Sequence, residues 1–125
     1  MKIFVFGNPD LDFDSLPIRI ISELKNNFPD ISFETKDPNE EWEIPENLIV
    51  IDTVSGIDKA VVFDDIDDFA ISPAITLHDF DAGTYLKYLK KLGKIKKIKI
   101  IGLPPIISEE EAVKEISIIL RANLF

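Results

Sequence analysis

Leu48-Ile49-Val50-Ile51-Asp52 is the most informative segment of the chain, because four consecutive apolar residues run directly into a carboxylate. Continuous apolar runs of this length are typical of strands in a parallel sheet, where helices cover both faces. A strand with one solvent-exposed face alternates instead between apolar and polar residues. We therefore predict a buried strand with Asp52 at its carboxyl end, where open α/β sheets usually carry their chemistry.

Strand-like and helix-like segments alternate along the chain on both sides of this run. Apolar residues predict further strands over 2–6, 31–33, 59–63 and 97–103, and Pro104-Pro105 ends the last of these. Such alternation predicts an α/β fold in three layers, a twisted and mostly parallel sheet with helices on its faces, of the phosphorylase- or hydrolase-like type. The 125 residues suit one domain that spans residues 1–125.

The first predicted helix covers residues 16–28, where apolar side chains recur at helical spacing. Ser15 precedes it and has the side chain of a good N-cap. Pro17 falls in the first turn, where a missing N–H costs little. The sequence therefore predicts one continuous helix that follows the loop after the first strand.

Two more helices are predicted in the second half of the chain. One covers residues 84–92 and closes at Gly93, a residue that favours the left-handed conformation of a helix end. The other runs to Leu120 and starts from Ser108 and Glu111, which have the spacing of a capping box. We expect both helices to pack on the sheet.

Two acidic segments are predicted to be loops at the surface. Residues 34–47 contain Pro38 and Pro45, which disfavour a regular strand or helix there. The run Asp64-Asp65-Ile66-Asp67-Asp68 is more typical of a solvated turn than of a metal cage. We therefore predict no metal site within the acidic run.

The overall charge excludes several kinds of partner. Twenty-three acidic residues against 14 basic ones give a formal charge of −9, which repels phosphate backbones and anionic lipid surfaces, so we expect no nucleic acid partner. No apolar run approaches the roughly 20 residues of a membrane helix, so we expect no membrane insertion. The apolar N-terminal run is too short for a secretion signal, which favours a cytoplasmic protein.

Several familiar catalytic motifs are absent from the sequence. There is no glycine-rich phosphate loop and no G-x-S-x-G elbow. A serine triad would have to recruit His78 with Ser15 or Ser55, and neither serine lies between two glycines as in the motifs that expose a nucleophile and shape an oxyanion hole. Asp52-Thr53-Val54 is similar to the Asp-Thr-Gly motif of aspartic proteases, but those enzymes are almost all-β, so the match is attributed to chance.

His78 is the only histidine of a chain that has no cysteine. Any transition-metal site must therefore combine this imidazole with carboxylates. Asp14 and Asp52 both follow predicted strands, so together with His78 they form a candidate set of one nitrogen and two carboxylate ligands. Such a set suits divalent nickel, zinc, manganese or iron and leaves coordination positions open.

Each member of this set also has an ordinary structural interpretation. Asp14 is placed to cap the helix over residues 16–28, and Asp52 to end its strand in an Asx-turn. His78 is equally compatible with a solvated loop. Asp79 is a candidate to orient the imidazole or to replace Asp14 as a ligand, whereas for Asp81 we favour a helix-capping role.

The order and spacing of five short motifs resemble those of the NiFe-hydrogenase maturation endopeptidases. In that family a Gly-Asn pair ends the first strand, an acidic residue follows seven positions after the glycine, a second aspartate ends a central strand, and a histidine comes from a later loop. The corresponding segments here are Gly7-Asn8-Pro9, Asp14, Ile18-Arg19-Ile20, Ile51-Asp52 and His78. The resemblance spans essentially the whole chain.

This resemblance implies a fold, an activity and a substrate. The family has helices packed on a twisted sheet, and its members are hydrolases that remove a C-terminal extension from the nickel-loaded precursor of the hydrogenase large subunit. It implies that nickel arrives with the substrate, and another divalent metal such as zinc is an option for the free protein. The residues implied to contact nickel and act in catalysis are Asp14, Asp52 and His78, and those implied to bind substrate are Gly7, Asn8 and Asp37.

Two loops depart from the family pattern. In the first, Asp12-Phe13-Asp14-Ser15-Leu16-Pro17, phenylalanine and proline stand where members carry paired acidic residues followed by glycine. The second departure affects the loop tied to substrate recognition. Residues 35–41 contain no glycine, where the family carries a glycine-rich loop with an aspartate; Asp37 is the candidate to replace that aspartate. An alternative function is therefore that of a non-cleaving relative that binds or chaperones a hydrogenase subunit during assembly. A third interpretation is an acidic α/β module without a metal site.

Overall fold

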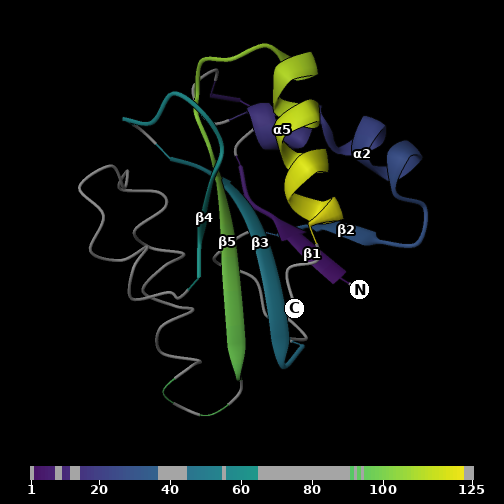
Figure 1. Cartoon of the computed structure of the whole chain (residues 1–125), viewed down its shortest axis with the longest axis vertical. Helices are drawn as coiled ribbons and strands as arrows, with labels where there is room; N and C mark the ends of the chain where they lie inside the picture. The colour runs from purple at the N-terminus through teal and green to yellow at the C-terminus, as the bar shows by residue number, and fades with distance from the viewer. Residues whose placement is uncertain are drawn as a thin grey trace.

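A computed structural model of the chain describes residues 2–7, 10–11, 15–36, 45–54, 56–64, 91, 93 and 95–122 (Figure 1). Its described strands form one five-stranded sheet in the order β2-β1-β3-β5-β4. Their bounds are Lys2–Val5 for β1, Ser32–Thr35 for β2, Asn47–Thr53 for β3, Val61–Phe63 for β4 and Lys97–Leu103 for β5. The predicted α/β class is confirmed.

The sheet is parallel except at one edge. β1 pairs in parallel with β2 and β3, and β3 pairs in parallel with β5 from Asn47↔Lys97 to Thr53↔Leu103. β4 is antiparallel to β5, with Val61 opposite Gly102. The sequence predicted a strand over 59–63, but the direction of that strand depends on its partner and is not encoded in its own residues.

The bounds of β2 and β3 correct two predictions. β3 continues through Thr53, so Asp52 is the penultimate residue of the strand and does not follow it. The predicted loop over 34–47 is shorter at both ends, because Glu34 and Thr35 belong to β2 and Asn47 begins β3. β2 extends beyond its apolar residues because it pairs with β1, and β3 does so because it pairs with β5.

The predicted helix over residues 16–28 is divided in two. α1 spans Leu16–Arg19 and α2 spans Ile21–Asn27, with a break at Ile20, whose φ is −96° and ψ is −2°. Ser15 occupies the N-cap position of α1, but its side chain makes no capping hydrogen bond to the described backbone. The reason is that Ser15 has helical dihedrals (φ −94°, ψ −15°), whereas a capping serine is usually extended.

The last helix, α5, spans Glu109–Arg121 and begins as predicted. Ser108 is extended, with φ −67° and ψ 153°, and its Oγ accepts a hydrogen bond from the Glu111 amide at 3.1 Å. Glutamates fill the first turn and Arg121 lies in the last, which complements the helix dipole. Local capping chemistry is therefore sufficient to locate this helix.

Gly93 has a φ of 75°, as expected for a glycine that closes a helix. The helix predicted over 84–92 lies outside the described residues apart from Lys91, which is helical. That prediction therefore stays open. Residues 65–68 of the predicted acidic turn also lie outside the described part of the chain.

Replacing Ser108 by alanine tests the cap of α5. We expect Ser108→Ala to lower the free energy of unfolding by about 1 kcal/mol, because the Glu111 amide loses its side-chain acceptor. Thermal unfolding followed by circular dichroism measures this loss. Ser22→Ala, at an exposed position within α2, is the matched control and should change stability by less than about 0.5 kcal/mol.

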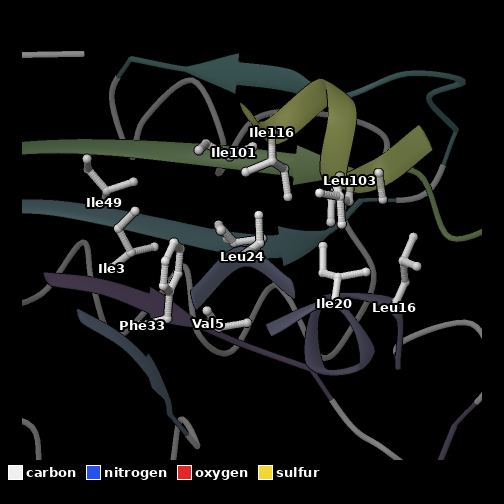
Figure 2. Close-up of a cluster of buried hydrophobic side chains, with 13 residues drawn as sticks. Ile3, Val5, Leu16, Ile20, Leu24, Phe33, Ile49, Ile101, Leu103 and Ile116 are labelled. Atoms are coloured by element: carbon white, nitrogen blue, oxygen red, sulfur yellow. The ribbon is translucent and has the colours of Figure 1, made fainter. Parts of the chain in front are cut away.

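Both faces of the sheet are buried, as the apolar run at 48–51 predicts. Side chains alternate along the strands, so Ile3 and Val5 point to one face and Phe4 to the other. The described helices α1, α2 and α5 supply their apolar residues to the first face (Figure 2). Its buried members are Ile3, Val5, Leu16, Ile20, Leu24, Phe33, Ile49, Ile51, Ile101, Leu103, Ala112, Val113 and Ile116. Those of the second face are Phe4, Phe6, Leu48, Val50, Val54, Ile95, Ile98 and Ile100.

Candidate functional site

The carboxyl ends of β1, β3 and β5 meet at one edge of the sheet, because these strands are parallel. We call it the carboxyl edge and define it by Gly7 after β1, Asp52 and Thr53 in β3, and Leu103 in β5. In Figure 1 it lies toward the top, where the chain leaves β5 and enters α5. α1 also packs against β3. The helices α1 and α5 therefore flank this edge on the face that Ile51 and Thr53 share.

Asp52 is the buried carboxylate of the carboxyl edge, with 1% of its surface exposed. Its Oδ1 accepts a hydrogen bond from the Thr53 amide at 2.8 Å. Thr53 lies beyond the last register pair of β1 and β3, Val5↔Ile51, so the Asp52 carboxylate accepts a hydrogen bond from an amide N–H that lies past the end of the pairing with β1. The bond fixes the direction of the Asp52 side chain on the central strand of the sheet.

Gly102 lies opposite Asp52 on β5 and was not singled out by the sequence. A Cβ atom added at Gly102 would lie 2.8 Å from Cγ2 of Val54 and 3.1 Å from Cε2 of Phe63. Val54 therefore packs directly onto the β5 backbone, and this contact positions the chain that leaves Asp52. A glycine inside an otherwise apolar strand, as in Ile100-Ile101-Gly102, is the signal that predicts such a close approach.

Thr53 adds a second polar side chain at the carboxyl edge that sequence reasoning missed. The residue is 2% exposed, and its Oγ1 has no hydrogen-bond partner within the described part of the chain. Strand alternation directs this hydroxyl to the helix-covered face, away from the side on which Asp52 lies. It carried no sequence signal because a threonine at a strand end is common.

Arg19 connects the start of α1 to the start of α5 through a hydrogen bond and an ion pair. Its Nε donates to Oγ of Ser15 at 3.0 Å, and its Nη1 lies 3.6 Å from Oε2 of Glu109. Leu16, Ile20 and Leu103 lie at the same end of the core in Figure 2, so this contact lies at the carboxyl edge. Arg19 belongs to the Ile18-Arg19-Ile20 motif of the family resemblance, and its contacts connect that motif to α5.

Two of the predicted site residues are described, and the structure brings them to one edge. Gly7 follows β1 and Asp52 lies in the neighbouring strand β3. The remaining predicted residues lie outside the described part of the chain: Asn8, Asp14, Asp37, His78, Asp79 and Asp81. Among the residues that the structure does describe, no group of three or more His, Cys, Asp or Glu side chains is placed to hold a metal ion.

The helices in the same described ranges are short. None of the helices there is long and apolar enough to cross a bilayer. α5, the longest described helix with 13 residues, also carries three glutamates in its first turn.

Three solved structures share the fold of this chain. The hydrogenase maturating endopeptidase HybD from E. coli aligns with a TM-score of 0.66 and 18% identity, over 98% of this chain and 93% of that chain. An endopeptidase from Escherichia coli aligns with a TM-score of 0.67 and 19% identity, over 98% and 93% of the two chains. The endopeptidase HycI from Escherichia coli aligns with a TM-score of 0.62 and 18% identity, over 91% and 85%.

No protein-family model and no curated protein sequence matches the chain. The structural likeness nevertheless covers nearly the full length of both chains in two of the three alignments. At this level of identity the likeness establishes a common fold, which is the fold implied by the motifs around Gly7 and Asp52. Activity and substrate are separate questions.

Proposed function

We propose that this chain is an endopeptidase of hydrogenase maturation. Its substrate is the nickel-loaded precursor of a NiFe-hydrogenase large subunit, from which it removes the C-terminal extension. Asp14, Asp52 and His78 contact the nickel carried by that substrate. Gly7, Asn8 and Asp37 contact the polypeptide around the cleavage point.

The position of Asp52 is the observation that carries this proposal. Asp52 is 1% exposed, and burying a carboxylate on the central strand costs more than burying an apolar residue even when polar partners satisfy it. A packing role alone is served equally well by an apolar residue, as at Val50 and Val54 of the same face. Asp52 lies instead at the edge where α/β sheets carry ligands, in a chain with the fold of three known endopeptidases.

The chemistry of the three side chains fits a substrate-borne nickel ion. One imidazole and two carboxylates form an N,O ligand set that divalent nickel accepts, and they leave positions open for the substrate's own ligands. The Thr53 amide holds the Asp52 carboxylate in one direction, as supporting hydrogen bonds usually do for ligating carboxylates. Contact with nickel would hold the adjacent substrate chain at the carboxyl edge and make cleavage depend on completed nickel insertion.

Cleavage of the precursor tests this proposal. The purified protein is incubated with large-subunit precursor that has or has not been loaded with nickel, and the product is sized by mass spectrometry. We expect a shorter product only from the nickel-loaded precursor, because the empty precursor lacks the ion that Asp14, Asp52 and His78 would contact. Equal cleavage of both forms would contradict the role of nickel.

A second function is favoured by one feature of the sequence. Residues 35–41 contain no glycine, so the backbone freedom of the family's substrate loop is missing. A non-cleaving relative would bind the precursor and protect or present it during assembly. Stable co-purification with a precursor that stays full length under every metal condition would support this alternative against proteolysis.

A further inference from the structure

Ile106 is the most exposed of the large apolar side chains in the described part of the chain. It is 89% exposed, compared with 60% for Ile118 and 38% for Leu11. Ile106 lies in the connection from β5 to α5, which starts at the carboxyl edge. Leu11 lies in the connection from β1 to α1, whereas Ile118 lies in the second half of α5.

The connection that carries Ile106 is anchored on both sides. Pro104 is buried and Pro105 is half-buried, and their rings restrict the backbone before Ile106. Ile107 packs against the helix-covered core, and Ser108 caps α5. Ile106 is therefore held outward by a rigid segment. This segment would lose little conformational entropy when a partner covers Ile106.

Acidic residues follow Ile106 along the chain, in the first turn of α5. Glu109 is paired with Arg19, whereas Glu110 is exposed and has no ion-pair partner among the described residues. The chain as a whole carries a formal charge of −9. An exposed isoleucine that is followed four residues later by an exposed carboxylate is complementary to a segment that carries both an apolar and a basic residue.

We propose that residues 104–110, which comprise the β5–α5 connection and the first two residues of α5, dock the polypeptide substrate at the carboxyl edge that holds Asp52, and this inference rests on the function proposed above. The occupant is a segment of the precursor polypeptide that covers Ile106 with an apolar side chain and places a Lys or Arg near Glu110. The connection starts next to Leu103, the register partner of Thr53, so a bound segment continues directly to the carboxyl edge. Ile106 and Glu110 are substrate-contact residues that determine specificity and take no part in bond cleavage.

Two pairs of variants test the docking surface. Ile106→Ser is compared with Ile118→Ser, which removes an exposed isoleucine from the second half of α5. Glu110→Lys is compared with Glu23→Lys, which reverses an exposed charge on α2. Steady-state cleavage of nickel-loaded precursor is measured for all four, together with the dissociation constant of the precursor and the Tm of each variant.

We expect Ile106→Ser to raise KM and the dissociation constant about tenfold, because the variant cannot bury an isoleucine on binding. The kcat should stay within about twofold, because the bound substrate is still cleaved at the carboxyl edge. Glu110→Lys should weaken binding by about threefold to tenfold, and more strongly at low salt. Both control variants should bind and cleave as wild type. Glu110→Lys and Glu23→Lys each place a cation in the first turn of a helix, so they should lower the Tm by a similar small amount, whereas the two serine variants at exposed positions should change it little.

The outcomes separate this inference from the proposed function. If wild type cleaves and Ile106→Ser has the same KM as Ile118→Ser, the docking surface is wrong and the endopeptidase function stands. If wild type binds precursor without cleaving it, the protease proposal fails. The docking surface is then tested by whether Ile106→Ser and Glu110→Lys bind precursor more weakly than their control variants. If wild type neither binds nor cleaves, both proposals are overturned.

Discussion

Asp52→Asn is expected to reduce nickel-dependent cleavage of the precursor strongly while leaving the fold intact. Asparagine has nearly the same shape, and its amide oxygen can still accept the hydrogen bond from the Thr53 amide. What the substitution removes is the negative charge that would contact the substrate's nickel. We expect kcat/KM to fall by about 100-fold or more, the loss usually seen when one preorganised polar group is removed from an active site.

A stability measurement and a control variant show whether the loss of cleavage arises at Asp52 itself. The Tm of Asp52→Asn should stay within about 4 °C of wild type, because a neutral amide is less costly to bury than a carboxylate. Asp64→Asn is the matched control, since it removes an exposed carboxylate that pairs with Lys99 at 2.7 Å. That control should cleave normally. Normal cleavage by Asp52→Asn would remove Asp52 from the proposed nickel contacts.

The strands and the last helix were predictable because their signals are local. The apolar run at 48–51 marks a doubly covered strand, and Ser108 with Glu111 marks the start of α5 through one hydrogen bond. Ser15 has an equally good side chain for a cap but does not act as one, because its backbone is helical. Side-chain type indicates a cap only when the chain enters the helix in an extended conformation.

The features of the site that sequence reasoning missed depend on long-range neighbours. Asp52 was predictable because a single strand places it near an edge. Gly102 acquires its role only because β5 pairs with β3 in a register that sets it opposite Asp52. The antiparallel direction of β4 has the same origin, since it depends on pairing with β5. Register is a relation between segments, so neither segment encodes it alone.

Gly102→Ala is expected to destabilise the protein, although the same change usually has the opposite effect. Alanine in place of glycine normally stabilises by about 0.4–1 kcal/mol where the backbone and the surrounding space allow it. Here the added Cβ would lie 2.8 Å from Cγ2 of Val54, so the buried side chain or the β3 backbone must shift. Overpacking of this kind costs about 1–3 kcal/mol, which lowers the Tm by roughly 4–12 °C.

The double variant Gly102→Ala/Val54→Ala identifies the cause of that loss. Val54→Ala alone should cost about 2 kcal/mol, because it removes two buried methyl groups. It also removes the atom that the new Cβ meets, so the double variant should be more stable than the sum of the single losses by about 1 kcal/mol or more. Strictly additive losses would mean that Val54 does not press on Gly102. Cleavage of nickel-loaded precursor should fall in Gly102→Ala and recover in the double variant. Without the Val54 side chain the chain at position 54 need not move, so Asp52, two residues earlier, keeps its place at the carboxyl edge.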